Sequence, residues 1–199
     1  MVRAGYDRIS NTYRSDDADD GNYGLWLEEL APLIPPGGRV LDLGCGNGVP
    51  VARWLAAHGF EVDGVDVSPV QIERAERLVP AATFACVDMT ALELPEASVD
   101  AIVAFYSLIH VPVAEHTSLL RQIAAWLRPG GHAMLIMGAG AWTGTEDDWY
   151  GAPMYWSHAD RETSLAWIAD AGLQVVWDRH IPEDESGHTL VLARRPAAA

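Results

Sequence analysis

Short apolar runs alternate with amphipathic runs along most of the chain. The runs VLDL, AIVAFY and AMLIM are almost continuously apolar, which is typical of parallel strands whose two faces are both covered by helices. Five strands separated by helical segments can be placed between residues 39 and 140. A helical run and two strand-like runs, LQVVWDRH and HTLVLARR, follow them. The alternation predicts an α/β fold with an open, doubly wound, mostly parallel sheet.

The chain is expected to form a single domain, because 199 residues suffice for one sizeable core but hardly for two. We expect residues 1–36 to form an N-terminal helical segment and residues 37–137 to form the alternating core. Residues 138–160 show neither helical nor strand periodicity and are rich in aromatic side chains, so they are predicted to be a loop insertion. Residues 161–199 are expected to form a helix and a hairpin.

Charge narrows the classes of partner. Acidic residues outnumber basic ones by 28 to 13, which gives a net charge of −15. Such a field repels a phosphate backbone, so we expect no nucleic-acid partner. The first residues carry charges and no continuous apolar stretch, and no later run is long enough to cross a bilayer. The expectation is therefore a cytoplasmic protein that does not insert into a membrane.

The cysteines, histidines and acidic residues bear on redox and metal chemistry. Cys45 and Cys86 each lie in or beside an apolar strand-like segment, so both are expected to be free thiols. The histidines and acidic residues show no spacing typical of metal ligands, such as H-x-x-x-H or paired cysteines. Metal-independent chemistry is the expectation.

The segment VLDLGCGNGVP is the first candidate for ligand binding. An apolar strand runs into Gly44, Gly46 and Gly48, and glycines let the backbone turn tightly and let a ligand lie against it. A dinucleotide-binding G-x-G-x-x-G fingerprint would need a third glycine where Val49 stands. The spacing therefore argues against a dinucleotide.

Two successive strands end in aspartate. Asp66 ends EVDGVDV, 22 residues beyond Gly44, where a carboxylate can accept hydrogen bonds from both hydroxyls of a ribose. Asp63 would compete only if the strand ended early, and Asp66 could also be a simple strand-end cap. Asp88 lies at the end of the run ATFACVDM, directly before Met89, and would lie beside an adenine bound across Asp66. The pair predicts a nucleoside site.

The motifs VLDLGCGNG, VDVSP, CVDM, SVDAIVAFYSLIHV and LRPGG resemble the successive motifs of class I S-adenosylmethionine-dependent methyltransferases. The resemblance covers residues from about 38 to 137. It implies a seven-stranded sheet with helices on both faces, a last strand, HTLVLARR, that runs antiparallel, and S-adenosylmethionine bound over the carboxyl ends of the first two strands. It also implies that Pro129 ends a helix and that the core is cofactor-binding.

The resemblance assigns roles to individual residues. The glycine turn would face the methionyl part, Asp42 would help hold its amino group, and Asp66 would hold the ribose. The segment YDRISNTY is similar to the leader helix that many small-molecule members fold over the cofactor, so residues 1–36 are expected to act as a lid. The cofactor-binding residues implied in this way are Tyr13, Asp42, Gly44, Gly46, Asp66, Val67, Asp88, Met89 and Phe105.

The acceptor side is predicted from the loop after the fourth strand and from the aromatic insertion. His110 is a candidate general base, because a loop after a central strand points into the crevice. A helix-end histidine bonded to backbone is the alternative. His158 is the second candidate base, and Tyr106 would border the reacting centre. Four aromatic residues are expected to contact the acceptor or simply to pack: Tyr6, Trp149, Tyr155 and Trp156.

These observations predict methyl transfer to oxygen or nitrogen of a small molecule, by in-line displacement with help from a general base. A nicotinamide-dependent oxidoreductase shares the glycine turn and the acid on the second strand. A noncatalytic S-adenosylmethionine-binding module would keep the same nucleoside pocket. Both remain alternatives at this stage.

Overall fold

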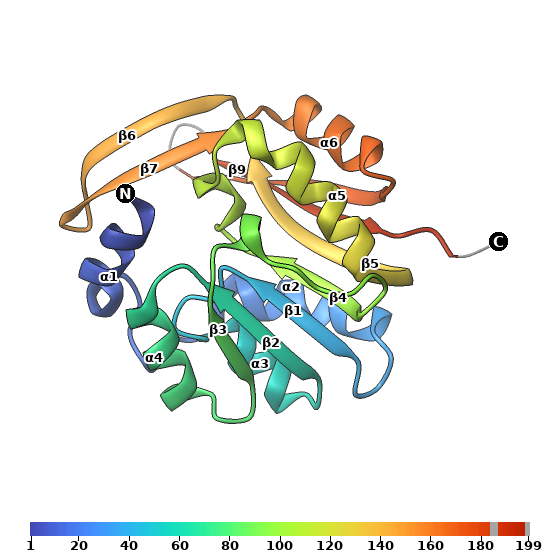
Figure 1. Cartoon of the computed structure of the whole chain (residues 1–199), viewed down its shortest axis with the longest axis horizontal. Coiled ribbons are helices and arrows are strands. Elements are labelled where there is room, and N and C mark those ends of the chain that lie inside the picture. Colours follow the sequence, from blue (N-terminus) through green and yellow to red (C-terminus); the bar gives the residue numbers. More distant parts are fainter. Residues whose placement is uncertain (184–186, 198–199) are drawn as a thin grey trace.

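The computed structural model describes residues 1–183 and 187–197 and has one seven-stranded sheet at its centre (Figure 1). The strand order is β3-β2-β1-β4-β5-β9-β8. Only β9 runs antiparallel to its neighbours, β5 and β8. The strands are β1 (Arg39–Leu43), β2 (Glu61–Asp66), β3 (Thr83–Cys86), β4 (Val99–Ala104), β5 (Leu127–Gly138), β8 (Gln174–Ile181) and β9 (His188–Arg194). The predicted sheet and its antiparallel last strand are confirmed.

Helices cover both faces of the sheet (Figure 1). Buried side chains of α2 and α3 form one apolar core with the sheet, and those of α5 and α6 form a second core on the opposite face. The α-helices are α1 (Val2–Tyr13), α2 (Gly21–Leu30), α3 (Val51–Ala57), α4 (Pro69–Leu78), α5 (His116–Trp126) and α6 (Arg161–Asp170). Short 3-10 helices are η1 (Ala31–Leu33), η2 (Met89–Ala91), η3 (Leu108–His110) and η4 (Val113–Glu115).

The central strands explain why the fold is stable. Every residue of β4 is buried, as expected for a strand with helices on both faces. Each fully buried large apolar side chain, such as Ile102 or Leu41, contributes about 1.5–3 kcal/mol relative to exposure. The core thus fixes the carboxyl ends of β1, β2 and β4 as a rigid platform.

Local capping sets where α4 begins. The Ser68 hydroxyl accepts a hydrogen bond from the Gln71 N–H at 3.1 Å, and Pro69 occupies the first helical position. The prediction for Pro129 is wrong, because α5 already ends at Trp126 and Leu127 is extended. LRPGG instead forms the first residues of β5.

The predicted loop insertion at residues 138–160 is also wrong, because most of it is a β-hairpin. β6 (Trp142–Trp149) pairs with β7 (Ala152–His158) through a turn in which Tyr150 and Gly151 both have positive φ. That combination matches the right-handed twist of a two-residue hairpin. The sequence does not indicate β6, because most residues of this strand are exposed and the strand therefore lacks the alternation of apolar and polar residues.

Two expectations concern the whole chain. Cys45 is buried and Cys86 exposed, and both are free thiols as predicted. Within the residues described, none of the helices combines the length and the apolar character needed to cross a bilayer.

Candidate cofactor and acceptor site

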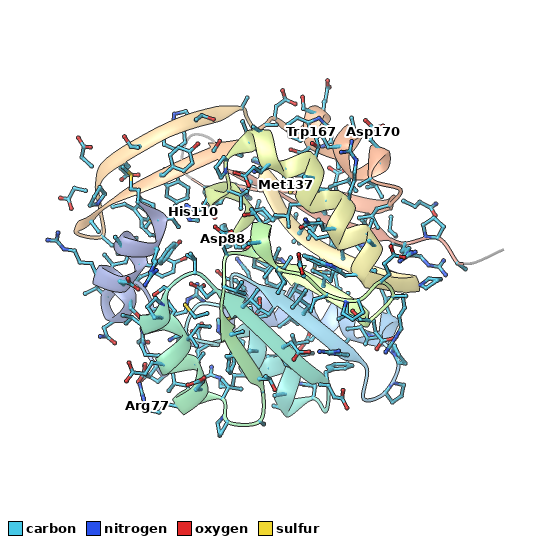
Figure 2. All side chains as sticks on the ribbon, viewed as in Figure 1. Arg77, Asp88, His110, Met137, Trp167 and Asp170 are labelled. Atoms are coloured by element: carbon cyan, nitrogen blue, oxygen red, sulfur yellow. The ribbon has the colours of Figure 1, made fainter. Side chains whose placement is uncertain are left out.

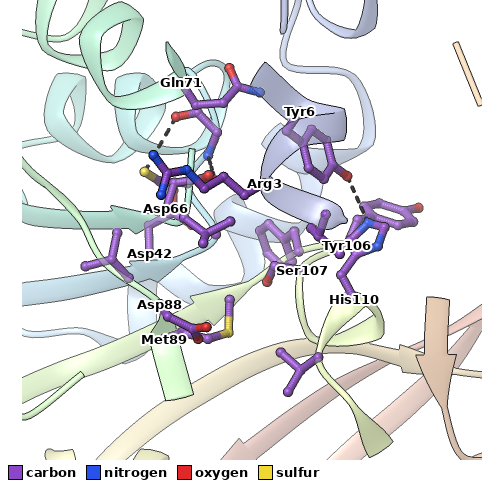
Figure 3. A pocket seen from close by; sticks show the side chains of 18 of the residues that line it. Arg3, Tyr6, Asp42, Asp66, Gln71, Asp88, Met89, Tyr106, Ser107 and His110 are labelled. Atoms are coloured by element: carbon purple, nitrogen blue, oxygen red, sulfur yellow. Dashed lines mark hydrogen bonds between the residues drawn. The ribbon is translucent and has the colours of Figure 1, made fainter. Parts of the chain in front are cut away.

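A cavity of about 480 Å³ lies where β1, β2, β3 and β4 end. It is lined by the glycine turn after β1, by the ends of β2 and β3, by residues 105–107 after β4, and by α1 on the other side. Parallel strands present their carboxyl ends at one edge of a sheet, so short loops from distant parts of the sequence meet there. Figure 3 shows these side chains converging on the cavity.

The glycine turn shapes one wall. Gly44 and Gly46 have φ of +79° and +55°, which side-chain-bearing residues rarely adopt. A Cβ on Gly44 would come 2.2 Å from the Cβ of Ser107, so only glycine allows the turn to pack against the loop after β4. Among the described residues, a Cβ on Gly46 would have one atom within 4 Å, Nε2 of Gln71 at 3.9 Å. The missing side chain leaves space along the wall where a ligand fits.

Asp66 lies in the cavity, and Asp63 does not. The Asp66 carboxylate accepts hydrogen bonds from the N–H groups of Gly46 and Ser68, both at 2.9 Å. Burial raises the pKa of Asp66, although these backbone hydrogen bonds oppose the shift. Asp63, which lies three residues before Asp66 on β2, instead forms an ion pair with Arg39 of β1 at 2.5 Å. Each Asp66 oxygen keeps a lone pair for a ligand hydroxyl.

Asp42 has an unused carboxylate oxygen. Its side chain is only 2% exposed, and Oδ2 has no hydrogen-bond partner in the part of the chain described. Burial raises the pKa of Asp42 to about 8, the charge of Asp66 adds to the increase, and Arg14 partly opposes it. A buried, unpartnered carboxylate on a cavity wall is suited to receive an ammonium group.

Asp88 and Met89 lie side by side on the wall after β3 (Figure 3). Asp88 is exposed, and its Oδ1 accepts hydrogen bonds from the Thr90 N–H at 2.9 Å and the Thr90 hydroxyl at 2.8 Å. These bonds fix the carboxylate at the start of η2. Val67 lines the same cavity. Tyr13 and Phe105 line it as well. All nine residues that the resemblance implied for cofactor binding therefore line this one cavity.

The turn after β4 carries Phe105 and Tyr106. Phe105 is buried against Tyr23 and Trp26, with ring centroids 5.8 and 5.4 Å apart. Tyr106 has φ of +56°, a conformation that is strained for a bulky residue and often found at functional sites. Burial raises the pKa of Tyr106, and the neighbouring Glu183 carboxylate raises it further. The strained turn presents the Tyr106 ring to the cavity.

His110 is held in one tautomer. Its Nδ1 lies 2.7 Å from the carbonyl oxygen of Tyr155, which can only accept, so Nδ1 carries the hydrogen. Nε2 then accepts from the Tyr6 hydroxyl at 2.9 Å. Burial lowers the pKa of His110 to about 4. His110 ends η3 and bonds to backbone, as the structural alternative expects, and its Nε2 faces the cavity with Tyr6. Its role as a general base stays a prediction.

A second cavity of about 690 Å³ adjoins the first and shares Tyr6, Tyr13, Tyr106 and His110 with it. Its outer wall comes from the hairpin, where Trp149 and Trp156 lie. Tyr155 lines the first cavity and contributes the carbonyl that holds His110. The predicted acceptor-side aromatics are therefore brought together, and Figure 2 shows His110 between α1 and the central sheet.

His158, the second predicted base, lines neither of the two cavities. Its Nδ1 lies 2.8 Å from the carbonyl of Gly140. The ring packs on Gly138, where a Cβ would come 2.1 Å from Nδ1. The base of the hairpin thus holds His158 away from the cleft.

Side-chain bonds fasten α1 to α4. The Ser68 hydroxyl donates to Asp7 at 2.6 Å, and the Ser10 hydroxyl donates to Gln71 Oε1 at 2.8 Å. Arg74, which is buried, contacts the backbone and hydroxyl of Ser10. Figure 1 shows α1 beside α4 and next to the hairpin. The helix thereby closes one side of the cleft.

Sequence reasoning missed several residues of the cavity, notably Arg14, Tyr23, Gln71 and Ser107. The Ser107 hydroxyl donates to the carbonyl of Leu43 at 2.5 Å and so supports the glycine turn. Arg14 directly follows the predicted leader helix, and that position was the available signal. The other residues contact the site through tertiary packing, for which the sequence has no local pattern.

Comparisons with known proteins agree with this geometry. A family model described as a methyltransferase domain matches residues 16–177. The 27-O-demethylrifamycin SV methyltransferase of Amycolatopsis mediterranei (strain S699) is 35% identical over 156 residues, which cover 67% of this chain and 57% of that protein. The chain spans about half the length of the first curated relatives it matches.

Solved structures share the fold along nearly the whole chain. The cyclase SpnF has a TM-score of 0.79 at 19% identity, and the similarity covers 98% of this chain and 95% of that one. The 1,6-didemethyltoxoflavin-N1-methyltransferase of Burkholderia thailandensis has a TM-score of 0.73 at 20% identity, covering 98% and 87%. At these identities the likeness shows the fold alone. Because the family model matches most of the sequence, the chain belongs to the class I S-adenosylmethionine-dependent methyltransferase family.

Proposed function

We propose that this protein transfers a methyl group from S-adenosylmethionine to oxygen or nitrogen of a flat small-molecule acceptor. The observation that carries the proposal is the arrangement of Asp42 and Asp66 in one cavity that adjoins, through Tyr6 and His110, a second cavity with aromatic walls. The first cavity suits a nucleoside bearing an ammonium group. The second is suited to a planar apolar compound.

Each wall residue has a role in this proposal. Asp42 faces the amino group, Asp66 and Val67 hold the ribose, and Asp88 and Met89 contact the adenine. Further contacts come from Gly44, Gly46 and Tyr13, with Phe105 and Tyr106 near the sulfonium and Tyr6, Trp149, Tyr155 and Trp156 toward the acceptor. Residues 1–36, with α1, act as a lid that excludes water.

S-adenosylmethionine, when bound, supplies an electrophilic methyl group. The residues of the chain align the acceptor and remove its proton. The tautomer of His110 leaves Nε2 as the accepting atom. With a pKa of about 4, His110 is a weak base. A hydroxyl oxygen that has gained a methyl group becomes so acidic that a weak base suffices.

Two observations support oxygen or nitrogen as the methylated atom. The relative from A. mediterranei is named for methylation at an oxygen, and the structural neighbour from B. thailandensis for methylation at N1. The polar group that faces His110 Nε2 is a phenol, Tyr6, so an acceptor hydroxyl or amine can make the same contact. The nicotinamide alternative is not favoured, given the family match and Val49 in place of the third glycine.

Calorimetry of cofactor binding tests the cofactor half of the proposal. Asp66→Asn should weaken binding of S-adenosylhomocysteine by about 2 kcal/mol, because a buried charge-assisted contact to the ribose is lost. Asp63→Asn is the matched control on the same strand and should leave the affinity unchanged, since Asp63 pairs with Arg39. Stronger binding of NADH than of S-adenosylhomocysteine would contradict the proposal.

Turnover separates an enzyme from a binding module. We expect release of S-adenosylhomocysteine with at least one member of a panel of planar phenols and aromatic amines. Tight cofactor binding with no turnover on such a panel would favour the noncatalytic alternative.

The remaining expectations belong to the proposal as well. We propose that nucleic acid is not a partner, supported by the net charge of −15. The free thiols of Cys45 and Cys86 support a reducing compartment such as the cytoplasm. Over residues 1–183 and 187–197, no group of three histidine, cysteine or acidic side chains could hold a metal ion.

A further inference from the structure

Arg14 follows the last residue of α1 and lines both cavities. Its guanidinium carbon lies 4.8 Å from the ring centre of Tyr23 and 5.5 Å from that of Tyr13. Nη2 also donates to the Tyr23 hydroxyl at 2.9 Å. The backbone is held too, because the carbonyl of Arg14 accepts from Arg74 Nη2 at 2.8 Å. The guanidinium is therefore fixed at the cavity wall.

Among the described residues, no carboxylate forms an ion pair with Arg14. Most arginines at the surface meet a carboxylate, as Arg161 does with Asp178 and Arg179 with Glu29. Arg14 is half-buried, and the side chains that act on its guanidinium are the phenols of Tyr23 and Tyr13. Most of the five N–H donors of the guanidinium are thus available to a ligand. A desolvated cation with free donors fits an anionic group.

Asp42 provides the complementary acidic group in the same cavity. Its Oδ2 is buried and unpartnered, and the positive charge of Arg14 acts on it across the cavity, opposing the rise in its pKa that burial causes. A carboxyl group and a guanidinium that line the same cavity match a zwitterion, in which an ammonium and a carboxylate share one carbon atom. The amino-acid end of S-adenosylmethionine is such a group.

We propose that Arg14 binds the α-carboxylate of the cofactor's methionyl group, while Asp42 faces its α-amino group. This inference rests on the proposed function, because it names a further residue for the same cofactor. Arg14 follows directly after α1, so the contact also ties the end of that helix to the cofactor. Recognition of the amino-acid end and closure of the cleft are then linked.

The rival cation in this cavity is Arg3. Its side chain is 62% exposed and lies 3.9 Å from Asp7, four residues further along the same helix. An exposed, already paired guanidinium binds an anion more weakly than a half-buried one with free donors. The structure therefore favours Arg14 over Arg3.

Calorimetry with three ligands tests the proposal. They are S-adenosylhomocysteine, its decarboxylated analogue S-adenosyl-3-thiopropylamine, and 5′-methylthioadenosine, which has no amino-acid end. Arg14→Gln should weaken S-adenosylhomocysteine about tenfold to hundredfold, the usual size of a lost charge-assisted contact. It should leave the other two affinities within about twofold of wild type, and Arg14→Lys should recover part of the loss.

Matched controls make the outcome decisive. Arg8→Gln changes an exposed arginine of α1 that lines neither cavity, so it should alter no affinity. An equal loss for all three ligands with Arg14→Gln would show a structural role and overturn the inference. A loss specific to the carboxylate with Arg3→Gln instead would assign the contact to Arg3. If wild-type protein bound 5′-methylthioadenosine and S-adenosylhomocysteine equally well, the inference would be overturned, but nucleoside binding would stand. If wild-type protein bound none of the three ligands, the proposed function itself would be overturned.

Discussion

The two walls of the cleft are built in different ways. On the cofactor wall, which is formed by the glycine turn after β1 and the ends of β2 and β3, backbone groups set the geometry. Asp66, for example, is held by the N–H groups of Gly46 and Ser68. On the acceptor wall, which is formed by the aromatic residues of α1, of the loop after β4 and of the hairpin, side chains hold side chains. Tyr6 and His110, which lie 104 residues apart in the sequence, form such a hydrogen bond. A wall made of backbone tolerates little change, whereas a wall of packed rings can be altered one ring at a time. The difference suggests how one scaffold keeps its cofactor and changes its acceptor.

The largest effect is expected on the cofactor wall, for Gly44→Ala. A Cβ there would lie 2.2 Å from Ser107 Cβ, and Gly44 has φ of +79°. Overpacking and the left-handed backbone together should lower the free energy of unfolding by about 3–4 kcal/mol. Urea denaturation measures the change through the midpoint of unfolding.

Gly59→Ala is the matched control for Gly44→Ala. Gly59 has φ of +84°, but a Cβ there would meet no atom within 4 Å. Gly59→Ala should therefore lower the free energy of unfolding by about 1 kcal/mol, because only the backbone conformation is unfavourable. Equal losses at Gly44 and Gly59 would show that the contact with Ser107 does not determine the shape of this wall.

The next effect concerns the acceptor wall and pH. His110 has a pKa of about 4 in the folded protein because it is buried, against about 6.5 when unfolded. Between these values the unfolded chain binds the proton and the folded chain does not, so stability falls as the pH is lowered from about 6.5 to about 4. The loss attributable to His110 should approach about 3 kcal/mol at pH 4.

Comparison with His110→Gln isolates that contribution, because other titrating groups are common to both proteins. The free energy of unfolding of the variant, measured in urea from pH 4 to pH 7, should depend less steeply on pH than that of wild type. Parallel curves would mean that His110 is not buried in its neutral form, and the acceptor wall would then lack its fixed hydrogen-bond acceptor.

The same contrast explains how much the sequence could predict. Asp66 follows directly from the strand that it ends, and Gly44 from the turn that follows a strand, so local patterns place them in the cavity. The order of apolar runs predicted all seven strands of the central sheet for the same reason. Where position depends on neighbouring residues in the chain, the sequence is informative.

Positions that depend on tertiary packing were harder to predict. His110 follows the fourth predicted strand and His158 lies in the predicted insertion after the fifth, yet only His110 lines the cavity, because the ring of His158 packs on Gly138. Arg14 acquires its position from Tyr23, a contact between two helical segments that no periodicity encodes. The exposed strand β6 lacked the apolar alternation by which strands are recognised.

The smallest effect is expected for Tyr6→Phe, and it gives the sharpest test of whether the two walls are independent. The substitution removes the hydrogen bond to His110 Nε2 and should lower the free energy of unfolding by about 1 kcal/mol. Affinity for S-adenosylhomocysteine, measured by calorimetry, should not change, because Asp42 and Asp66 are untouched. Tyr150→Phe is the control, since that exposed phenol lines the second cavity without a hydrogen bond among the described residues. If Tyr6→Phe instead weakened cofactor binding as strongly as Asp66→Asn, the hydrogen bond between Tyr6 and His110 would support both walls, and acceptor specificity could not change without disturbing the cofactor.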